Sequence, residues 1–126
     1  EYSYDSTWFD ITKNNIKSFI ANQRWETQNE VLFFEGNQFI IDEKTKTSLQ
    51  SLRLFLNEGQ DVTWKFRNGF SILTYEQFIK FYDFSINYIQ DCFKEEHRLT
   101  NLISSITTLE DLINFDFTEN WPKNIF

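Results

Sequence analysis

Several residue types with specialised chemistry are scarce in this chain of 126 residues. Its one cysteine, Cys92, cannot form an internal disulfide, and its place in a helical pattern is typical of a small buried side chain rather than a reactive thiol. Three glycines and one proline leave neither a phosphate-binding loop nor a flexible internal linker. Methionine is absent even from position 1, so we expect the chain to be cut from a longer polypeptide, with processing or trimming as the alternatives.

Long apolar runs and an excess of basic residues are also missing. No apolar run approaches the ~18 residues of a transmembrane helix, and residues 1–10 have neither the basic nor the apolar region of a signal peptide. The formal net charge is −7, whereas contact with nucleic acid or an anionic membrane depends on clustered lysine and arginine. We therefore expect neither nucleic acid nor a membrane as a partner.

Aromatic residues are abundant, at 19% of the chain with 15 phenylalanines, so rings supply most of the core volume. The length fits one domain with a substantial core. We predict a single domain over residues 1–126. It consists of a core module, 10–122, that follows an irregular or weakly extended junction segment, 1–9.

Two hairpins, at about 31–41 and 61–73, are predicted from turn signals between apolar residues. In the second hairpin, Asn68-Gly69 predicts a type I′ turn, which requires positive φ at both central residues. Gly36-Asn37 predicts the turn of the first hairpin. The apolar residues that alternate along the second hairpin are Val62, Trp64 and Phe66.

The first two helices are predicted from apolar residues at helical spacing. Asp10 caps a helix that extends to about Gln28. The apolar face of this helix is Ile16, Phe19 and Ile20, with Trp25 nearby. Asp42 or Thr45 begins the next helix, and Gly59 ends it in the left-handed conformation. The core residues of that helix are Leu49, Leu52, Phe55 and Leu56.

Thr74 and Gln77 form a capping box that begins the longest helix, which extends from Tyr75 to about Ser104. Its main apolar stripe is Phe78, Ile79, Tyr82, Ile86, Ile89, Phe93 and Leu99, and the residues that widen it are Phe81, Phe84 and Tyr88. Thr107 or Thr108 begins a last short helix.

Pro122 biases Asn120 and Trp121 to extended conformations and ends the ordered chain. These elements predict an α+β fold. Each of the two hairpins is followed by a helix, and an N-terminal helix and a short C-terminal helix pack with them around a small antiparallel sheet.

No constellation of residues indicates a reaction. His97 is the only histidine, and its neighbours Glu95, Glu96 and Arg98 are typical of a surface ion-pair cluster. A nucleophile elbow, G-x-S-x-G, and a calcium-binding loop are absent. Oxygen-only cation sites are conceivable at two acidic pairs, Asp42 with Glu43 and Glu110 with Asp111. We predict a non-enzymatic protein with no catalytic residue, metal site or cofactor.

Tryptophans leave one ligand-binding alternative open. Trp25 and Trp64 are suited to stacking on a sugar ring, but a tryptophan that alternates with apolar residues in a strand is more often part of the core.

Further motifs carry a family resemblance over about residues 16–122. Arg24 ends the first helix, and the first hairpin has the pattern G-x-x-F-x-x-D over residues 36–42. Further along are V-T-W at 62–64 and the tail T-L-E-D-L at 108–112. The remaining matching positions are Ser48, Leu49, Gly69, Leu73, Thr74, Phe93, Glu96, Ile103, Trp121 and Pro122. This pattern resembles the domain-of-unknown-function family 4376, small modules of phage tail-fibre and tail-fibre-assembly proteins. The chain is richer in phenylalanine than the alanine-rich members of that family.

The resemblance implies a virion module, located in the phage tail and made in the bacterial cytoplasm, that binds other virion or tail-fibre proteins. A trimeric fibre is one such partner. A tail-fibre assembly chaperone is the first alternative, and a small acidic phage inhibitor that mimics nucleic acid is a weaker one. The resemblance brings no catalytic residues.

Two groups of aromatic residues are predicted to contact a protein partner. Four rings within nine residues are too much apolar surface for a free tail, so the N-terminal group is a candidate junction with an upstream segment or a neighbouring subunit. The alternative is that these rings fold back onto their own domain. The candidate interface residues are Tyr2, Tyr4, Trp8 and Phe9 in the N-terminal group, and Phe81, Phe84 and Tyr88 on the broad face of the 75–104 helix.

Overall fold

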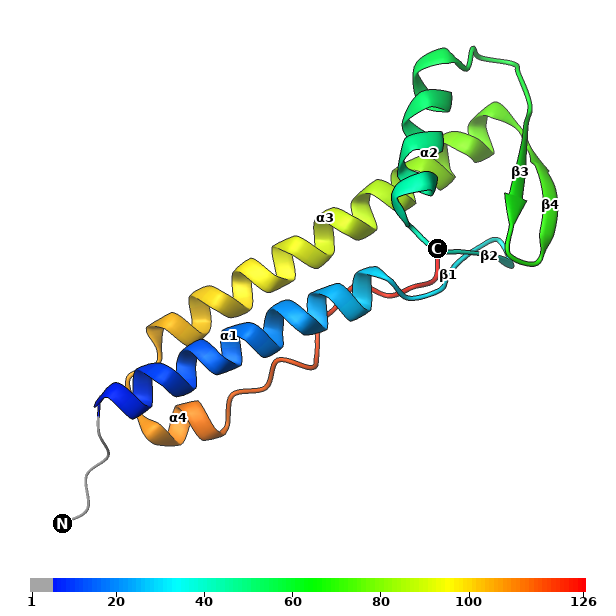
Figure 1. The fold of residues 1–126 in the computed structure, drawn as a ribbon. Coiled ribbons are helices and arrows are strands. Elements are labelled where there is room, and N and C mark those ends of the chain that lie inside the picture. Colours follow the sequence, from blue (N-terminus) through cyan, green and yellow to red (C-terminus); the bar gives the residue numbers. More distant parts are fainter. Residues whose placement is uncertain (1–5) are drawn as a thin grey trace. The chain divides into compact units, whose positions relative to one another are not determined.

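The computed structural model describes residues 6–126, which form two compact units. Unit 1 contains the described residues up to Thr27 together with Asp91–Trp121, and unit 2 contains Gln28–Gln90 and Pro122–Phe126. Along the chain the elements follow the order α1, β1, β2, α2, β3, β4, α3, α4 (Figure 1). The predicted α+β class, with each hairpin followed by a helix, is therefore confirmed.

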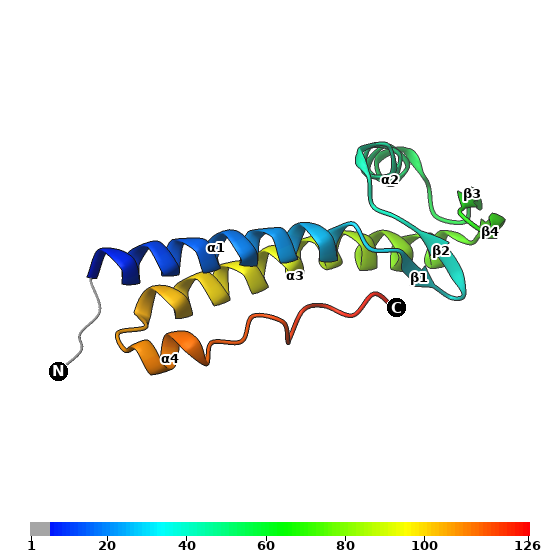
Figure 2. The ribbon, with the colours of Figure 1, turned by 60° about the horizontal axis from the view of Figure 1, so that its bottom comes forward.

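Unit 1 is helical. It contains α1 (Ser6–Gln28), the second half of α3 (Tyr75–Ser105) and α4 (Leu109–Ile113). In Figures 1 and 2, α1 lies beside this half of α3. The two helices are also joined by the ion pair between Arg24 Nε and Glu96 Oε1, at 2.7 Å. The core cluster at one end is Phe9, Ile103 and Leu112, with Ile16, Ile106 and Phe115 packed against it.

The first helix starts earlier than the sequence pattern predicts. It begins at Ser6, so Asp10 lies inside the helix and the prediction that Asp10 caps it is wrong. Phe9 is buried against Ile103 and Leu112. This packing explains why residues 6–9 are helical rather than irregular or weakly extended.

The buried face of α1 is narrower than predicted. Ile20 is buried and Ile16 is half-buried, as expected, but Phe19 and Trp25 are 56% and 60% exposed. Phe19 directly precedes Ile20 in the helix, so its side chain points about 100° away from that of Ile20. The assignment of Phe19 to the apolar face is therefore wrong, and Trp25, expected near that face, is also exposed.

The long helix α3 buries residues at steps of three or four. Its buried residues are Phe78, Phe81, Ser85, Tyr88, Cys92, Glu95, Leu99 and Ile103. Cys92 is fully buried, which confirms the predicted structural role. Phe93, placed in the stripe by the sequence pattern, is 45% exposed, with the Arg24 guanidinium 4.6 Å from its ring centre. Glu95 is the one carboxylate in the buried stripe, and it pairs with Arg98.

Unit 2 contains both hairpins, which form two separate two-stranded antiparallel sheets rather than one. In the first, β1 (Leu32–Phe34) pairs with β2 (Asn37–Phe39), and the turn is Glu35-Gly36, both with positive φ. The predicted turn at Gly36-Asn37 was therefore displaced by one residue. The type I′ geometry places its two left-handed residues before Asn37, because Asn37 pairs with Phe34.

The second hairpin pairs β3 (Val62–Phe66) with β4 (Gly69–Leu73). Its loop is Arg67-Asn68, and only the following Gly69 has positive φ, so the predicted type I′ turn at Asn68-Gly69 is wrong. Asn68 instead serves a tertiary role. Its Oδ1 accepts from Gln38 N at 3.0 Å and its Nδ2 donates to the Gly36 carbonyl at 3.3 Å, which joins the two hairpins.

Helix α2 (Glu43–Phe55) is capped by Asp42, whose Oδ1 accepts from Thr45 N at 2.8 Å. Leu49 is buried as predicted, but Phe55 is 79% exposed and does not belong to the core. The helix ends at Leu56 in an extended conformation, so Gly59, with φ +88°, bends the loop after the helix and does not form its C-cap.

The predicted capping box before α3 is confirmed, and of the two threonines predicted to begin the last helix, Thr108 caps α4. Thr74 N donates to Gln77 Oε1 at 2.9 Å and Gln77 N donates back to Thr74 Oγ1 at 3.2 Å, directly before α3. Thr108 Oγ1 accepts from Asp111 N at 3.2 Å before α4. These bonds satisfy backbone N–H groups that a helix leaves without an internal partner.

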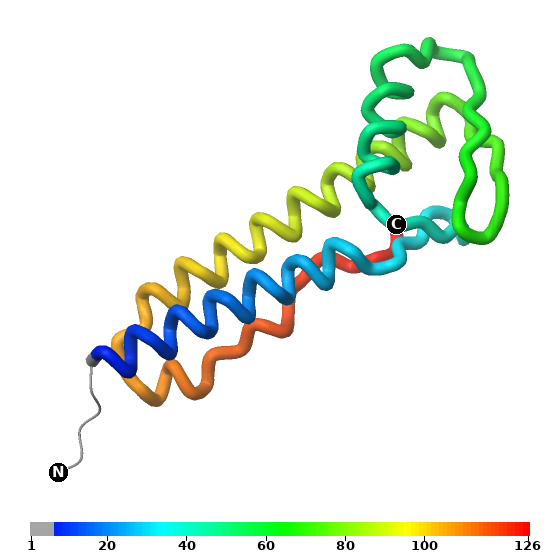
Figure 3. The backbone as a smooth tube through the Cα atoms, in the orientation of Figure 1, coloured from blue at the N-terminus to red at the C-terminus, as the bar shows by residue number. Residues whose placement is uncertain are grey.

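The chain does not end its ordered part at Pro122. Asn120 has φ +67° rather than an extended conformation, and residues beyond Pro122 lie along the free edge of β1 (Figure 3). Phe33 N donates to the Asn124 carbonyl at 2.8 Å, and Phe126 N donates to the Phe33 carbonyl at 2.9 Å. The C-terminal residues therefore act as a short parallel strand.

The core of unit 2 is aromatic, and Phe81 lies at its centre. Its ring is fully buried between rings from both hairpins and from its own helix. The rings within 6.5 Å of its centroid are Phe34, Phe39, Trp64, Phe66 and Phe78. The sequence-based expectation that rings supply most of the core volume is met here.

The Asp42 cap gives a prediction for stability. Hydrogen bonds from the Thr45 backbone N–H, and then from its side chain, lower the pKa of Asp42 below its ordinary value. A lowered pKa means that the carboxylate stabilises the folded state above pH ~4, and that this contribution is lost as the pH falls through the folded pKa. Asp42→Ala is expected to lower the free energy of unfolding by about 1 kcal/mol at neutral pH.

Urea denaturation at pH 7 and pH 3 measures both effects. Asp42→Asn is the matched control, because an amide still caps the helix but does not titrate in this range. The asparagine variant should differ from the original chain mainly in how its free energy of unfolding changes with pH. An equal loss for the alanine and asparagine variants at pH 7 would contradict the capping role.

Candidate functional site

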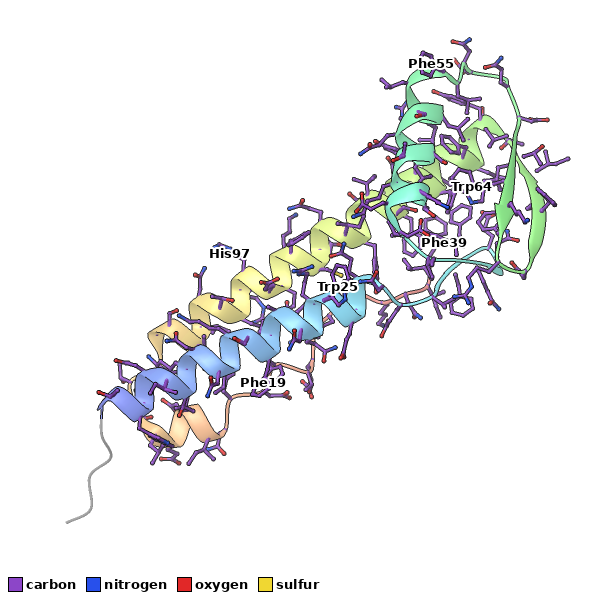
Figure 4. All side chains as sticks on the ribbon, in the orientation of Figure 1. Phe19, Trp25, Phe39, Phe55, Trp64 and His97 are labelled. Atoms are coloured by element: carbon purple, nitrogen blue, oxygen red, sulfur yellow. The ribbon has the colours of Figure 1, made fainter. Side chains whose placement is uncertain are left out.

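An open groove of about 590 Å³ lies in unit 2 between α2 and β3. One wall is the first three turns of α2, contributing Lys44, Thr45, Ser48 and Leu52, and the other is β3 with Thr63, Trp64 and Lys65. Phe39, Ile40 and Arg67 complete the lining. Figure 4 labels Phe39 and Trp64 in the region between α2 and the β3–β4 hairpin.

The apolar part of the groove is held by the aromatic core. The Phe39 ring lies edge-on to Phe81, with centroids 4.8 Å apart, and the Trp64 ring contacts the same ring at 5.3 Å. Phe39 is buried, whereas Trp64 and Leu52 are only half-buried. The groove thus offers a partner two apolar side chains on a rigid support.

The charged part of the groove is basic. Lys44, Lys65 and Arg67 line it, and no carboxylate does. None of these three cations forms an ion pair with any residue in the described part of the chain. Lys65 Nζ lies 5.6 Å from the centre of the Phe70 ring, which holds the lysine stem along the hairpin. This local positive charge is opposite in sign to the formal net charge of −7.

Backbone groups of β3 also face the groove. Because the hairpin loop has only two residues, Phe66 and Gly69 form its closing hydrogen-bonded pair, and such pairs recur at every second residue. Val62, Trp64 and Phe66 therefore direct their N–H and C=O groups towards β4. Those of Thr63 and Lys65 point to the opposite edge, where the described residues place no paired strand.

The groove lining carries several groups that can bind a ligand. The groove lining contains hydroxyl, ammonium, guanidinium and aromatic groups, but neither a histidine nor a carboxylate that would activate a nucleophile. It supplies cations, an apolar floor and an open strand edge. These are the groups that recognise an extended or anionic ligand.

The predicted interface residues are not gathered on one surface. Tyr2 and Tyr4 lie outside the described residues. In unit 1, Trp8 is exposed but Phe9 is buried in the core cluster. The fold-back alternative therefore describes Phe9 correctly.

The candidate interface residues on α3 all lie in unit 2. Phe81 and Tyr88 are buried core side chains, so they offer no exposed surface to a partner. Phe84 is half-buried between the rings of Phe39, Tyr88 and Phe126. The prediction that the broad aromatic face of α3 is open to a partner therefore does not fit the burial of two of its three residues.

Sequence reasoning did not find the groove or the exposed face of α1. In the sequence, Lys44 and the two basic residues of the second hairpin are separated charges; the fold brings them to one groove. The exposed face of α1 carries large apolar side chains away from the core: Trp8, Ile11, Phe19 and Trp25. A helical projection centred on Ile20 is the signal that separates them from the buried face.

The other residues considered for catalysis, ligand binding or metal binding are His97, Trp64 and the acidic side chains. His97 is exposed, and its Nε2 lies 3.3 Å from Asn101 Nδ2, whereas its neighbours Glu95 and Glu96 pair with Arg98 and Arg24. Trp64 contacts the core through the Phe81 ring, which agrees with the core prediction, and it also lines the groove. Among residues 6–126, no group of three or more histidine, cysteine or acidic side chains is arranged to hold a metal ion.

No helix in the described part of the chain has both the length and the apolar character to cross a membrane.

Comparison with known proteins identifies one family. Neither a curated protein nor a solved structure matches the chain significantly. A family model described as a domain of unknown function, DUF4376, matches residues 12–119, which include most of α1 together with both hairpins, α2, α3 and α4. The chain therefore belongs to the DUF4376 family.

Proposed function

We propose that this chain is a non-enzymatic module of a bacteriophage virion, a structural or adaptor domain of a tail-fibre or baseplate-proximal protein. Its resemblance to modules of tail-fibre and tail-fibre-assembly proteins supports this role. Its work is to bind other virion proteins, with a trimeric fibre as one such partner.

The observation that carries the binding role is the apolar outer face of α1. Phe9, Ile20 and Thr27 are buried on one side of this helix. Trp8 and Phe19, about three helical turns apart, lie together on a different side, and both are about half exposed. With Ile11 and Trp25, they put four large apolar side chains on the solvent side of one helix. Such side chains, tryptophan above all, dominate the energetics of protein interfaces.

Two experiments test this role. In the first, virions of the phage that encodes the full polypeptide are purified, and their proteins are quantified by mass spectrometry. We expect peptides from this chain at a stoichiometric level. Their absence from finished particles would overturn the virion role and support the assembly chaperone instead.

The second experiment tests the contact surface. Light scattering after size-exclusion chromatography measures the mass of a longer polypeptide that includes the upstream residues, alone and with purified tail proteins. We expect a complex, and we expect Phe19→Asp to reduce its formation. Asn101→Asp adds the same charge at an exposed site on α3 of the same unit and serves as the control. A longer polypeptide that stays monomeric and binds no tail protein would contradict the proposal.

A further inference from the structure

We propose that the groove between α2 and β3 binds an extended peptide segment in which acidic residues alternate with apolar ones, and that this segment adds to the free edge of β3 as a strand. This inference rests on unit 2 alone. It does not depend on the outer face of α1 or on the virion role.

The fold covers both outer edges of the first hairpin. The outer edge of β1 is covered by residues 124–126, through the two backbone bonds of Phe33. The outer edge of β2 is covered by the second hairpin's loop, since Arg67 N donates to the Gln38 carbonyl at 2.7 Å and Gln38 N donates to Asn68. In the described chain the outward groups of Thr63 and Lys65 on β3 receive no such cover, and both residues line the groove.

The positive charge of the groove favours acidic side chains in the bound peptide. Lys44 projects from the first turn of α2, and Lys65 and Arg67 belong to the second hairpin. None of the three forms an ion pair with a described carboxylate, although Lys44 attracts Asp42 and Lys65 lies over the Phe70 ring. Carboxylates of a ligand would therefore form charge-assisted hydrogen bonds here without breaking an ion pair. A basic segment would instead bring like charges together.

The geometry of a β-strand explains why apolar and acidic residues should alternate in the bound peptide. Successive side chains of an added strand point to opposite sides, so every second residue would face the floor formed by Phe39, Leu52 and Trp64. The residues between them would face the basic rim. The five residues of β3 span about 16 Å, so they match a segment of four to six residues. This mode of recognition combines main-chain bonds with alternate side-chain contacts.

The test uses the intact chain and a soluble, capped hexapeptide of alternating glutamate and valine. The peptide is titrated into the protein, and binding is measured from the NMR shifts of the protein's backbone amides. We expect saturable shifts, with the largest changes and slower hydrogen exchange at the Thr63 and Lys65 amides. The same peptide with lysine in place of glutamate is expected to bind at least about tenfold more weakly.

Two changes separate the parts of the proposal. N-methylation of the peptide amides that face β3 should abolish binding, because it removes the main-chain donors while leaving the protein unchanged. The double variant Lys44→Glu with Arg67→Glu should weaken binding by at least about tenfold. Lys80→Glu, an exposed charge reversal on α3 in the same unit, should have little effect.

Each of the opposite results would overturn one part of the proposal. Unchanged binding after N-methylation would rule out strand addition, and equal binding of the lysine peptide would rule out charge recognition. A sulfated oligosaccharide that binds the groove while no peptide does would show a carbohydrate site instead. Failure of all peptides to bind would end this inference but leave the mass spectrometry of virions unaffected.

Discussion

Phe81→Ala is expected to lower the free energy of unfolding by about 3–5 kcal/mol. The Phe81 ring is fully buried and contacts five other rings that come from both hairpins and from α3. Its removal would leave a cavity lined by Phe34, Phe39 and Trp64, which are held by separate backbone segments and can collapse only in part. Urea denaturation followed by circular dichroism measures the loss.

The matched control is Phe55→Ala, the same substitution at a ring that is 79% exposed near the end of α2. This variant should change the free energy of unfolding by no more than about 0.5 kcal/mol. A loss below about 1 kcal/mol for Phe81→Ala would mean that the ring is not central to the core. It would then be available to a partner, as the sequence pattern suggested.

Removal of residues 124–126 is expected to lower the free energy of unfolding by about 3 kcal/mol, from three hydrogen bonds at about 1 kcal/mol each. Two are the backbone bonds of Phe33 with Asn124 and Phe126. The third runs from Asn124 Nδ2 to the Val31 carbonyl at 3.0 Å. The Phe126 ring also contacts Phe34, with centroids 4.8 Å apart, so its loss would add to the effect.

Hydrogen exchange gives a local measurement of the same change. The Phe33 amide donates to the Asn124 carbonyl, so it should be protected in the full chain and exchange faster after truncation. Ile125→Ala keeps the backbone bonds and alters a largely exposed side chain, so it should be nearly neutral. Equal protection of Phe33 in the full and truncated chains would refute the pairing of the C-terminus with β1.

The locally determined features of this chain could be read from its sequence. The Thr74–Gln77 capping box, the Asp42 cap and the Thr108 cap each depend on groups three residues apart, and all are present. The existence of both hairpins and of the long helix also followed from spacing and turn residues. These features follow from the sequence because residues near in the chain satisfy one another's backbone groups.

Turn details were harder to predict, because tertiary contacts compete with local preference. Asn68 is a strong signal for a type I′ turn, yet its side chain instead bonds to Gln38 and Gly36 of the other hairpin. The two-residue loop therefore moved to Arg67-Asn68. In the first hairpin, the register of Phe34 with Asn37 shifted the turn by one residue in the same direction.

Only the tertiary structure decided which aromatic residues are buried. Phe19 and Ile20 are adjacent and both apolar, but α1 has one face for its core, and Ile20 occupies it. The sequence contains more large apolar side chains than the two units can enclose. The choice among them depends on which helix faces meet, and composition does not encode that.

The sequence by itself therefore determined the α+β class, the capped starts of α2, α3 and α4, and the membership of the chain in its family. The tertiary structure decided the pairing of residues 124–126 with β1, the enclosure of Phe81 and the basic groove formed by Lys44, Lys65 and Arg67. The physical reason is the separation along the chain of the groups that interact. Capping and turn bonds join groups a few residues apart, whereas these three features join segments that meet only after the chain has folded.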